Sequence, residues 1–258
     1  MGACLTRTEI QKKTPQSNFN TDKSTFYTDQ RKRLWKVHTE SNENETEFIY
    51  NNNIAVSKLA PHCNLLIPTS VIRQNKNTVL LCMSLGQTDL FNIIKQPFDW
   101  TFIEEELSAL SSAILYLHDN GIAHRDIKPE NIVLYRDRLC LIDFDFAGPV
   151  DNKSHCGTPF FKCPIKVTST WDCCDTDFSK RCDVYAFGKL ILAIFWQASA
   201  HGMVQHRRFI FDAFHADFVK DTLHPFTGSW GKWATIAMQC ISKVPPISIP
   251  TENNTETR

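Results

Sequence analysis

The sequence predicts an α+β protein in which a small sheet lobe precedes a larger helical lobe. Short apolar runs of the strand type are concentrated before residue 84, whereas helical periodicity prevails after Gly86. Strands that come first in the chain and helices that follow them are typical of the α+β class. The chain has 258 residues, which is enough for one two-lobed domain or for two small ones.

The sheet lobe is expected in residues 31–83, after a polar leader over residues 1–30 that is predicted to be flexible. Three consecutive asparagines at 51–53 weaken the one helix expected in this lobe, because Asn is a poor helix former. The elements expected here are a strand within residues 31–37, a loop over 38–46, a helix over 47–59, and strands over Leu65–Ile72 and Thr78–Met83 joined by a hairpin turn.

The helical lobe is expected in residues 84–248, and a polar tail in 249–258. Gly121 suits the stop of the first long helix. The irregular stretch 145–180 is too long for a plain connection, which indicates a functional segment. The expected elements are helices over Asp89–Lys95, Ile103–His118 and Val184–Trp196, and short strands over Ile132–Tyr135 and Leu139–Ile142.

The composition argues against several classes of protein. The formal net charge is zero, so nothing global points to a nucleic-acid partner. No apolar stretch of about 18 residues occurs, and the N-terminus lacks the apolar core of a secretory signal. The ten cysteines show no metal-binding spacing, so they are interpreted as reduced thiols of an intracellular protein. No pattern indicates an oligomeric state.

The extreme N-terminus matches the M-G-x-x-x-S/T pattern of N-myristoylation through Gly2, and Cys4 beside it is a candidate for palmitoylation. The second acyl chain matters, because one chain binds membranes only marginally. The alternative is a chance match of a short pattern in a polar tail. The sequence supports acylation and a chance match about equally, so membrane association through an acylated N-terminus is one of two expectations.

Residues 124–131, His-Arg-Asp-Ile-Lys-Pro-Glu-Asn, bring together several groups that phosphoryl transfer needs. Asp126 can accept the proton of an attacking hydroxyl or orient that hydroxyl, and Lys128 can reach the transferred phosphoryl group. Asn131 offers a carbonyl oxygen to a hard cation such as Mg²⁺. Asp143 follows the predicted hairpin, which returns the chain, so Asp143 can face Asn131 across the same metal.

These residues resemble the landmarks of the protein kinase family. The loop 124–131 matches H-R-D-x-K-x-x-N, and Asp143-Phe144-Asp145 matches D-F-G with its Gly replaced. The stretch 183–188 resembles the start of the central helix of the family's C-lobe. Cys156-Gly157-Thr158-Pro159 resembles the stretch before A-P-E, and Cys163-Pro164-Ile165 stands where A-P-E would be.

The resemblance covers roughly residues 33–248 and implies a two-lobed kinase fold with a reduced N-terminal lobe. It implies ATP and Mg²⁺ as cofactors and proteins with Ser or Thr as substrates. Lys128 and Thr158 are typical of the Ser/Thr subclass, in which this Thr hydrogen-bonds the catalytic Asp and Lys. Met83 would be the gatekeeper, and the hinge around Leu85 would receive adenine. The compact N-lobe resembles kinases of herpesviruses and other large DNA viruses.

The resemblance also suggests a regulatory residue. In many kinases the arginine before the catalytic Asp, here Arg125, docks a phosphorylated residue of the activation segment. Ser154 is the nearest candidate within 145–165. The other interpretation of Ser154 is an exposed loop serine.

Several positions depart from the family pattern in the small lobe. No glycine occurs between Gly2 and Gly86, so the G-x-G-x-x-G loop is absent, and any loop there must cover ATP less well. Lys36 is the best candidate for the phosphate-contacting lysine, with an exposed strand lysine as the alternative. Its usual glutamate partner falls at Asn53, which cannot form an ion pair, and Glu47 could replace it only in another helix register.

Two more departures lie in the large lobe. Asp145 replaces a glycine beside the metal-binding Asp143, where it could be an extra metal ligand or could weaken the active arrangement. Ile165 replaces the Glu of A-P-E, and the segment 240–248 lacks the Arg that usually pairs with that Glu. Losing both members of a buried ion pair costs far less than losing one.

The sequence therefore supports two classes of function. An active Ser/Thr kinase is favoured, because all four catalytic and metal-binding side chains are present. The alternative is a pseudokinase that acts as a binding or regulatory module, which the missing glycine loop, Asn53 and Asp145 favour. A small-molecule kinase on the same fold is a third interpretation, and the peptide-binding character of the Thr158 region argues against it.

The acylation hypothesis predicts that Gly2→Ala shifts the protein from the membrane fraction to the soluble fraction, because the acceptor amine is then no longer that of a glycine. Fractionation of cells that express either form measures this shift. An unchanged distribution would contradict the hypothesis.

Overall fold

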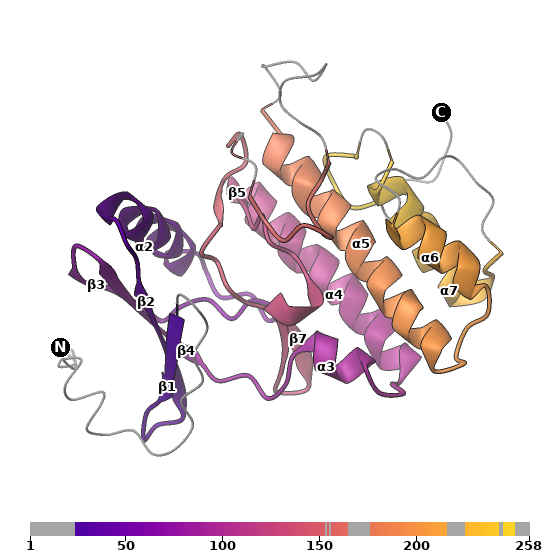
Figure 1. The fold of residues 1–258 in the computed structure, drawn as a ribbon, viewed down its shortest axis with the longest axis horizontal. Helices are drawn as coiled ribbons and strands as arrows, with labels where there is room; N and C mark the ends of the chain where they lie inside the picture. Colours follow the sequence, from indigo (N-terminus) through magenta and orange to yellow (C-terminus); the bar gives the residue numbers. More distant parts are fainter. Residues whose placement is uncertain are drawn as a thin grey trace.

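The computed structural model describes residues 24–152, 154, 156–164, 176–215, 225–242 and 245–250. Figure 1 shows two lobes, with strands β1–β4 and helix α2 on one side and helices α3–α7 on the other. The predicted α+β class is therefore confirmed. Gly2, Cys4 and Ile165 lie outside the described residues.

The small lobe contains an antiparallel sheet with strand order β1-β2-β4-β3. Its strands are β1 (Ser24–Thr28), β2 (Arg33–Thr39), β3 (Ser70–Asn75) and β4 (Thr78–Ser84). β1 lies inside the leader that was predicted to be flexible, and that expectation is wrong for residues 24–28. The strand is ordered by pairing with β2, in which Phe26 stands opposite Lys36, and polarity alone did not reveal this partner.

Helix α2 (Glu43–Ser57) packs against β3 and β4 and starts four residues before the predicted position. The Asn42 side chain caps it by accepting a hydrogen bond from the Glu45 amide at 2.8 Å. Asn52 and Asn53 are buried and make hydrogen bonds to the large lobe, which offsets their low helix propensity. Tertiary contacts thus keep a helix whose sequence alone is unfavourable.

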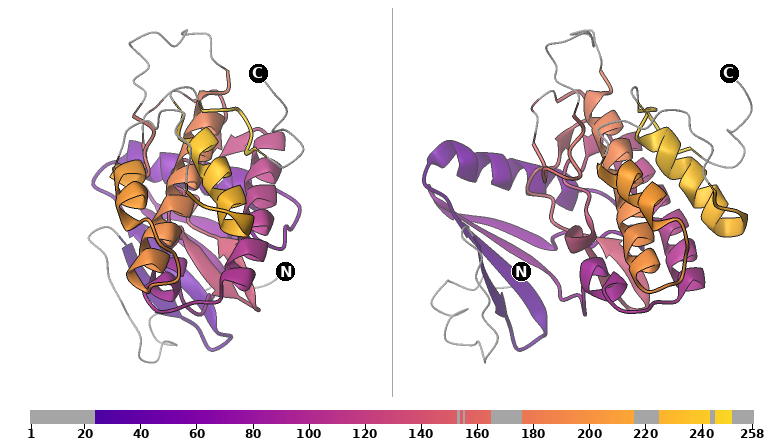
Figure 2. Two further views of the ribbon diagram at one scale, coloured as in Figure 1. Left: turned by 90° about the vertical axis from the view of Figure 1, so that its right-hand side faces the viewer. Right: turned by 45° about the vertical axis from the view of Figure 1, so that its right-hand side comes forward.

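The large lobe is built around the long helix α5, which runs between α4 on one side and α6 and α7 on the other (Figures 1 and 2). The predicted hairpin is the pair β6–β7. The elements are α3 (Leu90–Ile94), α4 (Trp100–Asp119), β5 (Ile122–Ala123), η1 (Pro129–Asn131), β6 (Ile132–Tyr135), β7 (Arg138–Leu141), β8 (Gly148–Pro149), α5 (Phe178–Ala200), α6 (Arg207–His215) and α7 (Gly228–Cys240).

The main hydrophobic core fills the large lobe and reaches across to α2. Val56 of α2 and Phe144 are both buried in this cluster, together with Leu65 and Leu141, which also form a β-bridge. Two smaller clusters cover the two faces of the sheet. Among the described residues, no helix combines the length and apolar character needed to cross a membrane.

Gly188 lets α5 and α7 approach closely. A Cβ at this position would lie 2.6 Å from the Cβ of Cys240 and 2.9 Å from Cγ2 of Ile241. Both contacts are shorter than any that carbon atoms tolerate, so a larger side chain must push the helices apart.

We expect Gly188→Val to lower the free energy of unfolding by at least about 2 kcal/mol through overpacking. Chemical denaturation measures the change, and Ala200→Val at the exposed end of α5 is the control. Equal losses in the two variants would mean that the α5–α7 contact does not depend on a glycine.

Candidate active site

One buried carboxylate, Asp183 in α5, holds the loop 124–131 in place. It accepts hydrogen bonds from the backbone amides of His124 and Arg125, both at 2.7 Å, and lies 2.9 Å from Nε2 of His118. Arg125 has a φ of 69°, a left-handed conformation that is unfavourable for this residue. The Asp183 bonds stabilise this conformation and so fix the backbone directly before Asp126.

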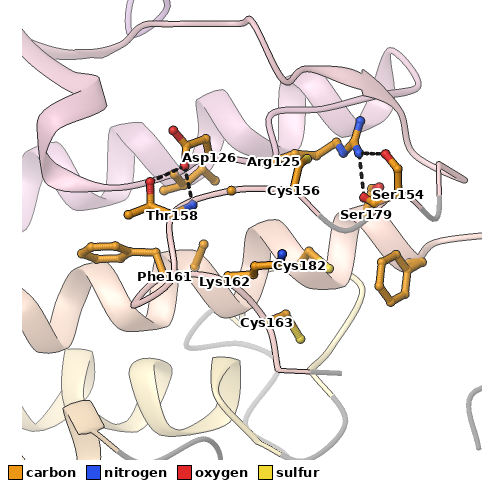
Figure 3. Close-up of a pocket in the computed structure, with 14 residues that line it drawn as sticks. Arg125, Asp126, Ser154, Cys156, Thr158, Phe161, Lys162, Cys163, Ser179 and Cys182 are labelled. Carbon is orange, nitrogen blue, oxygen red and sulfur yellow. Dashed lines mark hydrogen bonds between the residues drawn. The ribbon is translucent and has the colours of Figure 1, made fainter. Parts of the chain in front are cut away.

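Asp126 is surrounded by hydrogen-bond donors that come from its own loop and from Thr158, and Figure 3 shows the contacts with Thr158. Its Oδ2 accepts from Asn131 Nδ2 at 2.9 Å and lies 2.9 Å from Lys128 Nζ. Its Oδ1 accepts from the Thr158 amide at 2.9 Å and from Oγ1 of Thr158 at 2.7 Å. Lys128 Nζ also donates to Thr158 Oγ1 at 2.7 Å, which closes a ring of three side chains.

The environment of Asp126 favours its ionised form. Burial opposes ionisation, but the hydrogen bonds from Lys128 and Thr158 outweigh it and lower the pKa of this carboxyl. Gly157 has a φ of 105°, and a Cβ there would lie 2.7 Å from the Arg125 carbonyl oxygen. Only glycine therefore lets the backbone bring Thr158 so close to Asp126.

A cleft of about 490 Å³ lies between the two lobes, within the size range of small-molecule sites. Lys36, Asn131 and Asp143 all line it. The β6–β7 hairpin brings Asp143 back to the loop 124–131, where the Ile142 amide donates to the Asn131 carbonyl at 2.9 Å. This backbone contact keeps the oxygen-bearing side chains of Asn131 and Asp143 at one edge of the cleft.

The donor set of this cleft fits Mg²⁺ held together with a phosphate group. Asn131 uses its side-chain NH₂ on Asp126, which leaves its carbonyl oxygen to a cation, and Asp143 adds a carboxylate. Among the described residues, no group of three or more His, Cys, Asp or Glu side chains could hold a metal ion. Two oxygen ligands suit Mg²⁺, which usually completes its coordination with phosphate oxygens and water.

The far end of the cleft is formed by the segment that follows β4. Met83, Leu85 and Gly86 line it, and Met83 is buried on the sheet face that packs against α2. Gly86 packs on Val133, where a Cβ would come within 2.7 Å of Cγ2. Within the described part of the chain, the Leu85 backbone amide and carbonyl have no hydrogen-bond partner, so they can serve a ligand.

Lys36 is buried in the cleft, which excludes the alternative of an exposed strand lysine. Only 7% of its surface is exposed, and its Nζ lies 2.9 Å from Oδ1 of Asp143 and 2.6 Å from Oδ2 of Asp145. Burial opposes its charge, but Asp145 and then Asp143 outweigh this effect and raise the pKa of Lys36. The ammonium group is therefore charged and held by two carboxylates.

The two carboxylates next to Lys36 differ in their electrostatics. Burial and the neighbouring Asp145 raise the pKa of Asp143. Burial also opposes ionisation of Asp145, but Lys36 and then His38 hold the pKa of Asp145 well below its usual range. A cation bound by Asp143 would favour its ionised form.

The comparison with known proteins identifies the family. Residues 25–242 match the protein kinase domain. The chain belongs to the protein kinase family. Its two-lobed fold agrees with the fold that the sequence resemblance implied.

Several serine/threonine kinases are similar to this chain over part of its length. A candidate serine/threonine-protein kinase of Acanthamoeba polyphaga mimivirus, R436, is 30% identical over 168 residues, or 59% of this chain and 58% of that protein. Serine/threonine-protein kinase DCLK1 of Rattus norvegicus is 29% identical over 55% of this chain and 34% of its own. Serine/threonine-protein kinase chk-2 of Caenorhabditis elegans is 30% identical over 56% and 32%. The matches thus span between 32% and 58% of the length of these relatives.

The segment around Ser154 contacts Arg125 directly. The Arg125 guanidinium donates to the Ser154 carbonyl at 2.7 Å and to the Ser154 hydroxyl (Figure 3). It also donates to the Phe146 carbonyl at 3.1 Å. Cys156 lines the same small cavity, and burial raises the pKa of its thiol. The raised pKa disfavours the thiolate of Cys156, which is the form that acts as nucleophile or metal ligand.

Sequence reasoning found most of the site residues but missed the partners of Asp145. The structure brings together Asp126, Lys128, Asn131 and Thr158, and it places Lys36 beside Asp143. It also places Asn53 next to Asp145, which was not foreseen. The sequence signal that could have revealed this contact is a pair of departures from the family pattern. Asn53 of α2 replaces a carboxylate, and Asp145 after Phe144 introduces one.

We expect Asp183→Asn to lower the free energy of unfolding by more than about 2 kcal/mol, because an amide cannot accept both backbone hydrogen bonds and leaves buried donors unpaired. Asp119→Asn, at the exposed end of α4, is the matched control and should change stability by about 0.5 kcal/mol or less. Denaturant titrations compare the two. A loss in Asp183→Asn as small as in the control would show that the loop does not depend on this carboxylate.

Proposed function

We propose that this protein is a Ser/Thr protein kinase that transfers the γ-phosphoryl group of ATP to protein hydroxyls. The observation that carries the proposal is the closed arrangement of Asp126, Lys128 and Thr158, with Asn131 bound to the same carboxylate. Family membership and the similar serine/threonine kinases support it.

Each residue of this arrangement has a role in the proposed reaction. Asp126 is ionised and orients the attacking hydroxyl, while Lys128 stabilises negative charge that develops on the transferred group. Two of the four donors around the Asp126 carboxylate, the amide and the hydroxyl of Thr158, belong to a separate segment of the chain. Thr158 would therefore help to hold Asp126 in the position from which it orients the hydroxyl.

ATP and Mg²⁺ are the cofactors that the cleft would accept. Asn131 and Asp143 would hold the metal, Lys36 would contact phosphate, and the backbone around Leu85 would bind adenine beside the gatekeeper Met83. When bound, Mg-ATP supplies the phosphoryl group and the metal's positive charge. The size of the cleft, its oxygen donors and the free backbone groups at Leu85 support this assignment.

A pseudokinase is the second candidate, and one sequence observation favours it. The absence of glycine between Gly2 and Gly86 removes the backbone freedom that lets a loop close tightly over phosphates. Such a protein would keep the catalytic loop but bind nucleotide weakly or not at all. Its function would then be to bind a partner.

Incorporation of radiolabelled phosphate from ATP into a Ser/Thr protein substrate distinguishes the two candidates. Asp126→Asn should reduce incorporation at least about 100-fold, because orientation of the hydroxyl is lost while the shape of the side chain is kept. Equal incorporation by the two proteins would contradict the proposed kinase activity.

Thermal unfolding with and without Mg-ATP provides an independent measurement. A ligand that binds only the folded state raises the melting temperature, so we expect a rise for the wild-type protein and a similar rise for Asp126→Asn. No change in either protein would favour the pseudokinase.

Four expectations stay predictions of the sequence: docking of phosphorylated Ser154 on Arg125, an intracellular location, membrane association and membership of a viral subfamily.

A further inference from the structure

We propose that Asp145 is a positioning residue for Lys36 and replaces the carboxylate that kinases usually carry on the helix of the small lobe. The inference rests on the proposed function, because Lys36 matters as the group that contacts phosphate. In the family, the phosphate-contacting lysine is held by a glutamate of that helix. Here the helix carries Asn53 at the corresponding position, and the carboxylate comes from the segment after Phe144 instead.

The contacts of Asp145 are those of an anchor for Lys36. Its Oδ2 lies 2.6 Å from Lys36 Nζ and 3.0 Å from Nε2 of His38. Its Oδ1 accepts a hydrogen bond from Asn53 Nδ2 at 3.1 Å. Both oxygens thus face donors of the small lobe, and the short contact to Lys36 is that of a charge-assisted hydrogen bond.

The same contacts argue against Asp145 as an extra metal ligand. The cleft is lined by Asp143 and Phe144 but not by Asp145. The side chain of Asp145 is 14% exposed, whereas that of Asp143 is 31% exposed. A metal in the cleft would have to compete with Lys36, His38 and Asn53 for the two oxygens of Asp145.

Asn53 is the matching half of this arrangement. An amide NH₂ donates to Asp145, whereas a glutamate at position 53 would place a second negative charge beside it. The neighbouring Asn52 donates to the Asp145 carbonyl at 2.7 Å, so two adjacent side chains of α2 hold one residue of the large lobe. The two departures from the family pattern therefore compensate each other.

The backbone accommodates Asp145 without the strain that replacing a glycine could cause. Asp145 does not have a positive φ, and within this segment the left-handed conformation falls on Asp143, with a φ of 66°. Asp is one of the residues that tolerate this conformation. Position 145 thus needs no glycine in this arrangement, and a carboxylate can occupy it.

One consequence concerns control of the site. In the family, movement of the small-lobe helix makes or breaks the ion pair of the lysine. In this protein the anion comes from the segment that also contains Asp143. The position of Lys36 is therefore tied to the segment 143–145 directly, and to α2 through the hydrogen bonds that Asn52 and Asn53 make to Asp145.

The test is a reciprocal exchange with Asp145→Gly, Asn53→Glu and the double variant. Each single change should weaken binding of a fluorescent ATP analogue at least about tenfold, because the first removes the anchor of a buried charge and the second adds a like charge beside Asp145. Glu is one methylene longer than Asn, so in the double variant it can reach Lys36 once Asp145 is absent. We expect the affinity of the double variant for the ATP analogue to lie within about threefold of the wild-type affinity. The effects of the two substitutions should not add, because the two side chains are neighbours and each compensates for the other.

The melting temperature without nucleotide provides a readout that does not depend on activity. Both single variants should melt below the wild-type protein, and the double variant should melt above the less stable of the two. The isosteric Asp145→Asn keeps the shape of the site if Asp145→Gly fails to fold, and it should also lose affinity. Asp137→Gly, an exposed turn aspartate with a φ of 59°, is the matched control and should not alter nucleotide binding.

A Lys36→Met background separates positioning from a purely structural role. If Asp145 acts through Lys36, Asp145→Gly should cause no further loss of nucleotide affinity in this background. If Asp145→Gly lowers nucleotide affinity as much in the Lys36→Met background as in the wild-type protein, the proposal is overturned. It is also overturned if the double variant binds nucleotide no more tightly than the weaker of the two single variants. Nucleotide titrations of Asp145→Gly with and without Mg²⁺ test the alternative that Asp145 is a metal ligand. A loss of nucleotide affinity that occurs only when Mg²⁺ is present would support this alternative and overturn the proposal. These results stand apart from the Asp126→Asn assay, which tests phosphate transfer itself.

Discussion

Asp145 joins the two lobes through four contacts, and the geometry of the cleft between them depends on these contacts. Its carboxylate meets Lys36 and His38 of β2 and Asn53 of α2, and its backbone carbonyl accepts from Asn52. A buried ammonium group is stable only with a close counter-charge. Because this counter-charge comes from the large lobe, the sheet that carries Lys36 is held against the segment that carries Asp143.

The catalytic loop depends on a separate constraint, the Asp183 carboxylate. It stabilises the left-handed backbone of Arg125 from within α5, which is the best-buried helix of the large lobe. Asp126 and its donors therefore owe their arrangement to the large lobe alone. In the proposed function the small lobe contributes to nucleotide binding only, and this division would explain how a small lobe without glycines between Gly2 and Gly86 can accompany an ordered loop 124–131.

The features that could be predicted from the sequence are those encoded by nearby residues. The loop 124–131 and the β6–β7 hairpin were identified because their spacing is local, and the same holds for α4 and α5. The start of α2 was missed, since it depends on a cap at Asn42 rather than on apolar periodicity. β1 was missed because its order comes from pairing with β2, which a polar flank does not reveal.

The role of Asp145 could not be read from either position alone. Asn53 and Asp145 are 92 residues apart, and each by itself indicated a damaged kinase. The fold places Asn53, which lacks the usual negative charge, next to Asp145, which adds one. Asp145 therefore takes over the role of the missing carboxylate as the partner of Lys36. Such compensation is invisible in a sequence because propensity and spacing describe only local order.

The measurement that tests this account most directly is a crystal structure with Mg²⁺ and a non-hydrolysable ATP analogue. We expect Lys36 Nζ to contact a phosphate while it remains within hydrogen-bond distance of Asp145, with Asn131 and Asp143 on the metal. A structure in which Asp145 coordinates Mg²⁺, or in which Lys36 binds phosphate with Asp145 turned away, would contradict it.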